Sequence, residues 1–287
     1  MFKQIVAGVD EHHGDDAVAL ARMLLDADGE LTLAHVHRSD AHMQLEDRER
    51  FAAAERERSR RVLETVRDRA GVDAGLRWRS SDSVGRGLHE LCEALAADLL
   101  VVGSSRGALV GRLRMPDDTR AALDGAPCAV AIAPVGLAGE PRELHEIGVG
   151  YDASPESEHA LAVARTLAAQ AGAKLSAFEA VAFPSSAFGS GRPLLRSAID
   201  ALVDGARERI AGLRGVEPRA AYGEPAEELS IYSAGLDLLV IGARGYGPVG
   251  RLIHGSTSRE LTRSARCSLL VLPRAGREAT ERPAGEG

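Results

Sequence analysis

The chain contains an internal repeat, and this repeat constrains its fold more than any other feature of the sequence. Three blocks recur in the same order, at offsets of 142, 139 and 139 residues: IVAGVD at 5–10 as IGVGYD at 147–152, DLLVVG at 98–103 as DLLVIG at 237–242, and APCAVAIAP at 126–134 as ARCSLLVLP at 265–273. Because order and spacing are both kept, the 287 residues predict two tandem copies of one domain.

Each copy alternates short runs of Val, Ile and Leu with longer segments rich in Ala, Leu, Arg and Glu. Nearly continuous apolar runs are typical of strands buried on both faces of a parallel sheet, and here they lie at 2–9, 31–36, 99–102, 238–241 and 269–272. The intervening segments predict helices at 15–25, 44–69, 157–171 and from about 193 onward. This alternation predicts an α/β protein with two tandem doubly wound, Rossmann-like parallel-sheet domains.

Glycine and proline mark the expected boundaries. We expect copy one at residues 1–134, a linker at 135–144 and copy two at 145–274. A tail at 275–287, rich in Gly, Pro, Glu and Arg, is expected to be disordered. The Ser- and Gly-rich stretch 185–191 predicts a mobile loop inside copy two.

Charge and cysteine content limit the possible partners and compartment. The chain has 42 acidic and 35 basic residues, a net charge of −7, which disfavours a broad nucleic-acid surface. Three cysteines make no disulfide framework, so a reducing cytoplasm is the expected location. The longest apolar run, 128–139, is too short to span a membrane, and the first residues form a strand rather than the apolar core of a signal peptide.

A glycine-rich loop after the 238–241 strand carries the clearest chemical signal. Gly242 is followed by Gly245, then by nine residues, then by Gly255 and Ser256. Glycine allows backbone N–H groups to approach an anion closely, and the start of a following helix favours phosphate. The loop also leaves the carboxyl end of a predicted parallel strand, where open α/β sheets bind ligands. The pattern therefore predicts a phosphate-binding site.

Neighbouring residues extend this site toward a nucleotide. We expect the helix to begin at about Ser258, because Thr257 and Glu260 have the spacing of a capping box. Asp152 ends the first strand of copy two and can reach the same crevice. A carboxylate there accepts hydrogen bonds from ribose hydroxyls or an adenine amine, and does not suit phosphate.

Taken together, these residues resemble the universal stress protein family. Its pattern Gly-2x-Gly-9x-Gly-(Ser/Thr) is matched at every position, and its early Asp falls on Asp152; the resemblance covers 1–134 and 145–274. It implies compact five-stranded domains, like those of adenine nucleotide alpha hydrolases, with ATP and possible Mg²⁺ in the crevice. Carried over by position, the nucleotide-binding set is Asp152, Ala153, Ala180, Ile241, Gly242, Arg244, Gly245, Gly255, Ser256, Thr257 and Ser258. Ala180 departs from the family, which commonly has a larger aliphatic residue there.

Copy one departs further from the pattern. It keeps Asp10 and Gly103, but Arg106, Pro116 and Asp117 stand where copy two has Gly245, Gly255 and Ser256. A carboxylate repels phosphate, and proline removes a donor N–H group. Copy one is therefore predicted to have a degenerate nucleotide site.

The resemblance implies a cytoplasmic, ATP-binding stress-response regulator that forms a homodimer, with the last strands at domain or subunit contacts. We expect no catalytic residues, and slow ATP hydrolysis or self-phosphorylation at Ser256 or Ser258 at most, because no general base and no P-loop lysine is evident. The alternative is an interaction module of the same family that binds no nucleotide and acts through its dimer surface.

Three other patterns predict different chemistry and are weaker. Residues 103–107 fit Gly-x-Ser-x-Gly, but a nucleophile elbow needs a helix directly after its serine, and 108–116 reads as a loop. Residues 245–250 fit Gly-x-Gly-x-x-Gly, but the ribose-binding acid about 20 residues later is missing. A histidine group in copy one lacks carboxylates at metal-ligand spacing, so no metal site is predicted: His12, His13, His35, His37 and His42.

Overall fold

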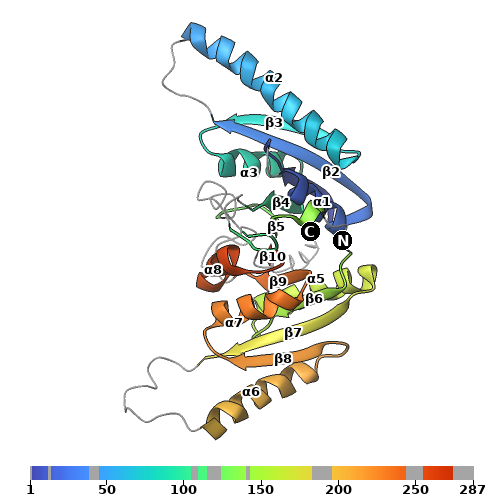
Figure 1. Ribbon diagram of the computed structural model, residues 1–287, viewed down its shortest axis with the longest axis vertical. Coiled ribbons are helices and arrows are strands. Elements are labelled where there is room, and N and C mark those ends of the chain that lie inside the picture. Colours follow the sequence, from blue (N-terminus) through green and yellow to red (C-terminus); the bar gives the residue numbers. More distant parts are fainter. Residues whose placement is uncertain are drawn as a thin grey trace, which may run out of the picture.

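Ten strands of the described chain form one continuous sheet, with helices on both faces (Figure 1). The computed structural model describes residues 2–11, 14–38, 45–104, 109–114, 124–139, 143–182, 196–243 and 255–273, and only the backbone at 45–51. The strand order is β3-β2-β1-β4-β5-β10-β9-β6-β7-β8. Neighbouring strands are parallel within each copy, and β5 and β10 meet antiparallel at the centre.

The strands of the two copies correspond one to one. The strands of copy one are β1 (Phe2–Gly8), β2 (Leu25–Arg38), β3 (Gly75–Ser81), β4 (Leu99–Gly103) and β5 (Ala129–Ala133). Those of copy two are β6 (Glu146–Gly150), β7 (Lys174–Val181), β8 (Glu217–Tyr222), β9 (Leu238–Gly242) and β10 (Ser268–Leu272). The described helices are α1 (Gly14–Leu24), α2 (Leu45–Ala70), α3 (Val84–Ala94), α5 (Pro155–Ala171), α6 (Arg196–Ala211), α7 (Pro225–Tyr232) and α8 (Ser256–Ser264). Two short 3₁₀ turns complete them: η1 (Leu137–Gly139) and η3 (Ser233–Gly235).

The predicted α/β class and the alternation of strands and helices are confirmed. One strand differs from its prediction, because β2 begins at Leu25 rather than near residue 31. Its extra residues continue beside β1 across an irregular register, in which Phe2 pairs with Leu25 and Gln4 with Glu30. The stretch 185–191 and the tail lie outside the described residues.

A repeated aspartate explains why the DLLV blocks are so alike. Asp98 accepts hydrogen bonds from the backbone N–H groups of Lys3 and Gln4, at 2.8 and 3.1 Å. Asp237 does the same for His145 and Glu146, at 2.8 and 2.9 Å. Each aspartate thereby ties the start of β4 or β9 to the start of β1 or β6. The following Leu and Val residues are fully buried because both faces of the sheet are covered.

Side chains of a single strand alternate between two cores, one on each face of the sheet. In β4, Leu99 and Val101 join the core beneath α1, and Leu100 and Val102 join the core beneath α3. Both cores run through both copies. The predicted linker takes part in this packing, since Leu137 is buried and Asp16 of α1 accepts hydrogen bonds from the N–H groups of Gly136 and Ala138.

The strand order also places the ligand crevice. In copy two the chain runs from β6 outward to β7 and β8, then returns to β9 on the other side of β6. Open α/β sheets bind ligands at the carboxyl ends of strands where the order reverses in this way. The expected crevice lies between the ends of β6 and β9, and its counterpart in copy one lies between β1 and β4.

Candidate functional site

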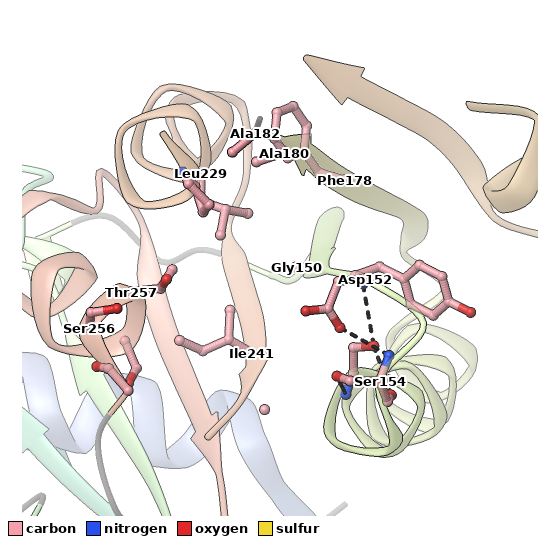
Figure 2. Close-up of a pocket in the computed structure, with 16 residues that line it drawn as sticks. Gly150, Asp152, Ser154, Phe178, Ala180, Ala182, Leu229, Ile241, Ser256 and Thr257 are labelled. Atoms are coloured by element: carbon pink, nitrogen blue, oxygen red, sulfur yellow. Dashed lines mark hydrogen bonds between the residues drawn. The ribbon is translucent and has the colours of Figure 1, made fainter. Parts of the chain in front are cut away.

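A cavity of about 520 Å³ occupies the crevice of copy two. The described residues that line it are Gly150, Tyr151, Asp152, Ser154, Ser157, Phe178, Ala180, Ala182, Pro225, Leu229, Ile241, Gly242, Gly255, Ser256, Thr257 and Ser258. Figure 2 shows Asp152 and Ser154 on one side of the cavity and Ser256 and Thr257 on the opposite side, with Ile241 between them. This volume lies within the range of small-molecule sites.

One part of the cavity is apolar and firmly supported. Ala180, Leu229 and Ile241 line it, and the small side chain of Ala180 leaves room beside them. Phe178, which also lines the cavity, stacks on Tyr232, with ring centroids 4.7 Å apart. The Tyr232 hydroxyl lies 2.5 Å from Ser176 Oγ, and burial raises the pKa of Tyr232 to about 12, so the hydroxyl stays neutral. A flat heterocycle fits such a wall.

The turn between β6 and α5 presents a carboxylate to the same cavity. Ala153 has a φ of 58°, a left-handed conformation that turns the chain sharply into the helix. Asp152 Oδ1 accepts a hydrogen bond from the Ser154 N–H group at 3.0 Å, and the Asp152 N–H group donates to Ser157 Oγ at 3.3 Å. Ser154 Oγ in turn caps α5 by accepting from the Ser157 N–H group. The side chain of Asp152 is therefore held by a local network.

The start of α8 faces the cavity and has a glycine at its N-cap. Gly255 is the N-cap residue, and glycine has no side chain with which to cap the first N–H groups of the helix. The predicted capping box is therefore wrong: the helix begins at Ser256, so Thr257 already lies within its first turn. Ser258 is turned back, because its hydroxyl donates to the Gly255 carbonyl at 3.0 Å. The N–H groups at a helix start and the helix dipole together favour an anion at this end.

Gly242 has a packing role that the sequence did not reveal. A Cβ atom at this position would lie 2.4 Å from the carbonyl oxygen of Glu156, in the first turn of α5. Glycine therefore lets α5 lie directly on the end of β9. Close packing of helix on strand, rather than close approach to an anion alone, requires this first glycine of the pattern.

The cavity unites most of the residues predicted for the nucleotide site. Asp152, Ala180, Ile241, Gly242, Gly255, Ser256, Thr257 and Ser258 all line it. Ala153 shapes the turn but is not among the lining residues, and Arg244 and Gly245 lie outside the described residues. For copy one, Arg106, Pro116 and Asp117 also lie outside them.

Several lining residues were not predicted. Tyr151 lies in the turn after β6, Phe178 in β7 and Leu229 in α7, and no local pattern marks them. Ser154 and Ser157 were discoverable, because a serine before Pro155 with acidic residues after it is typical of a helix start.

Within the described part of the chain, no group of three or more His, Cys, Asp or Glu side chains is placed to hold a metal ion. Among the same residues, no helix is long and apolar enough to cross a membrane.

Comparison with known proteins identifies the family. Residues 1–134 and 143–273 each match the model of the universal stress protein family. A universal stress protein of Mycobacterium tuberculosis is 30% identical over 183 residues, 61% of this chain and 61% of that protein. One from Thermus aquaticus is 33% identical over 135 residues, 43% of this chain and 95% of that one.

The fold comparison agrees with the sequence. The crystal structure of a universal stress protein from Archaeoglobus fulgidus matches with a TM-score of 0.66 and 18% identity, covering 95% of this chain and 98% of that one. The chain thus spans about three fifths of the mycobacterial relative and nearly all of the archaeal structure. Two matches to the family model and a shared two-copy fold show that this chain belongs to the universal stress protein family.

Proposed function

We propose that copy two binds ATP and that the chain acts as a cytoplasmic stress-response regulator. One observation carries the proposal: a single cavity joins an apolar wall, a carboxylate and the start of a helix whose N-cap residue is glycine. The wall at Ala180, Leu229 and Ile241 suits adenine, Asp152 suits the ribose hydroxyls, and the N–H groups after Gly255 suit phosphate.

In this proposal ATP is a conformational ligand rather than a substrate. Among the described lining residues, Asp152 is the one carboxylate and no histidine or lysine faces the phosphate end. Phosphoryl transfer needs a residue that positions the attacking group and cations that neutralise the developing charge. We expect steady-state turnover below about 1 s⁻¹, the low end of ordinary enzymes.

The test begins with the purified chain prepared without added nucleotide. It is denatured, and released small molecules are identified by chromatography and mass; calorimetric titration with ATP and Mg²⁺ follows. About one adenine nucleotide per chain, or one ATP site by titration, is the expected result. If no nucleotide is released and ATP does not bind, the proposal is rejected in favour of the interaction module.

Gly255→Asp is the sharpest variant. Aspartate is a preferred N-cap residue, so α8 should keep its stability while the new carboxylate repels phosphate. Gly235→Asp adds the same charge where a Cβ atom meets nothing within 4 Å, and serves as the matched control. Loss of ATP binding in Gly255→Asp alone supports the site; equal binding in both variants places the phosphate elsewhere.

Homodimer formation stays a prediction. β5 and β10 already pair with one another inside the chain, through Leu269–Ile132, Leu270–Ala131 and Val271–Val130. A dimer of whole chains must therefore use other surfaces. Sedimentation velocity over a range of concentrations tests it.

A further inference from the structure

A segment of copy one contacts the helix that begins at the proposed ATP site. Residues 109–114 of copy one stand, by the repeat, where copy two has 248–253, a part of its glycine-rich loop. The Leu113 N–H group donates a hydrogen bond of 2.9 Å to the carbonyl of Ala265, the C-cap residue of α8. A part of the loop that is predicted to be degenerate in copy one is therefore attached to copy two.

A tight turn at 109–112 holds this segment in place. It is closed by a backbone hydrogen bond of 3.0 Å between its first and last residues, and Gly111 has a φ of 77°, which glycine adopts without strain. The Gly111 N–H group donates to the Val135 carbonyl at 2.9 Å. The residue after Leu113 donates its N–H group to Ser104 Oγ at 3.3 Å. Leu113 is thus fastened to copy one on both sides.

The side chain of Leu113 is also part of the contact between the copies. Its exposed fraction is 1%. It belongs to the same core as Leu261 of α8 and Ala265, and as Val130 and Ile132 of β5. Removing a side chain from such a position leaves a cavity, and the surrounding elements move to fill it only in part. Leu113 therefore supports the packing of α8 as well as its last turn.

Both copies hold the end of α8. Within copy two, Ser230 Oγ of α7 donates to the Ser264 carbonyl at 2.7 Å, and Ser233 Oγ accepts from the Arg266 N–H group at 2.9 Å. α8 packs against α7 and β10 of its own copy (Figure 1). The hydrogen bond from Leu113 adds a support that comes from copy one. The position of α8 therefore depends on both copies.

α8 connects this support to one end of the second-copy cavity. The helix has nine residues, so its ends lie about 13 Å apart. Ser256, Thr257 and Ser258, at its start, line the cavity. A rigid helix carries a shift at one end to the other. Such a shift would misalign the first N–H groups with a bound phosphate, and charge-assisted hydrogen bonds depend on this alignment.

We infer that Leu113 is a positioning residue for phosphate binding in copy two, because it supports α8 from copy one. The inference rests on the proposed binding of ATP and adds that the second site needs the first copy. It concerns the phosphate end alone, since Asp152, Ala180 and Leu229 belong to the β6–α5 turn, β7 and α7. ATP should therefore respond to a change at Leu113, and adenosine should not.

Leu113→Ala tests the inference on the full chain. Leu20→Ala in α1 is the matched control, because it makes the same truncation at a fully buried position of the core on the other face of the sheet. In calorimetric titration with ATP and Mg²⁺, affinity should fall at least about tenfold in Leu113→Ala and less than about twofold in Leu20→Ala. Equal ATP affinities in the two variants overturn the inference. If wild type binds no ATP, the proposed function fails and the inference fails with it.

Adenosine distinguishes positioning from a general loosening of the chain. It has no phosphate to contact α8, so its affinity should be the same in wild type and in Leu113→Ala. A loss of adenosine affinity as large as the loss of ATP affinity would mean that the whole cavity is disturbed, and would overturn the inference. Circular dichroism and thermal unfolding check that both variants are folded at the temperature of the titrations.

Hydrogen exchange on wild type gives a measurement that needs no variant. Phosphate bound at the start of α8 should hold the helix in place and thereby stabilise the hydrogen bond from Leu113 to Ala265. Exchange of the Leu113 amide, followed by NMR, should therefore be slower with ATP than with adenosine. Equal exchange of this amide with ATP, with adenosine and without ligand would overturn the inference, even if Leu113→Ala does not fold.

Discussion

Gly242→Ala tests the packing on which the second-copy cavity depends. The new Cβ atom would lie 2.4 Å from the Glu156 carbonyl oxygen and 2.8 Å from Glu156 Cβ, and ordinary contact begins at 3.4 Å. The first turn of α5 must therefore move by about 1 Å, because backbone cannot rotate away as a side chain can. Overpacking of this kind costs about 1–3 kcal/mol of unfolding free energy. At about 2–4 °C per kcal/mol, the midpoint of thermal unfolding should fall by about 2–12 °C.

The same displacement should weaken ligand binding, since the moving turn carries Ser154 and Ser157, which hold Asp152 in place. Differential scanning calorimetry measures the unfolding midpoint, and titration with ATP measures the affinity, which should fall at least tenfold. Gly235→Ala is the control, because a Cβ atom there meets nothing within 4 Å. If Gly242→Ala unfolds and binds like wild type, α5 does not rest on this glycine and the packing argument fails.

Three further substitutions or titrations test other parts of the chain. Tyr232→Phe leaves the buried hydroxyl of Ser176 without its partner and should cost about 1–3 kcal/mol in chemical denaturation; an unchanged midpoint would show that water replaces the bond. Leu113→Ala empties a fully buried position between the copies and should cost about 2–5 kcal/mol, whereas a cost below 1 kcal/mol would mean that the site collapses around it. Burial lowers the pKa of His37, and His37 stacks on Trp78, the single tryptophan of the chain. Trp78 fluorescence should therefore be quenched, and unfolding free energy lost, as the pH falls below 6.5. A transition midpoint above pH 6.5 would contradict this.

Much of the fold was predictable because the signals are local and repeated. Runs such as Leu238–Ile241 are apolar on both faces, which is the pattern of a central parallel strand, and the repeat doubled every such signal. The antiparallel pairing of β5 with β10 was not predicted from the sequence. Strand direction across a domain boundary depends on how two finished sheets meet, and no residue pattern encodes it locally.

The site was predicted in part for the same reason. The glycines, Asp152 and Ser256 stand at positions of the family's short motifs, so the resemblance identified them. Of the apolar wall, Ala180 and Ile241 were predicted from the family resemblance. Leu229 and the supporting pair Phe178–Tyr232 were missed, because they belong to elements far apart in sequence. The capping box failed because Thr257 and Glu260 have the right spacing but lie two residues too late, since the N-cap residue is Gly255. The spacing between two residues shows whether they can share a helical turn, but it does not determine the residue at which the helix begins.

The two copies are joined at more than the central strand pair, and this bears on how their two crevices are connected. α8 begins at the second-copy cavity, and just beyond its other end the Ala265 carbonyl accepts a hydrogen bond from Leu113 of copy one at 2.9 Å. The next residue, Arg114, donates its N–H group to Ser104 Oγ, and Ser104 lines a cavity of about 180 Å³ at the ends of β1 and β4. These contacts join the end of α8 to a segment of copy one that borders this cavity. Fusing two copies into one sheet thus connects the two crevices through backbone hydrogen bonds as well as through the central strand pair.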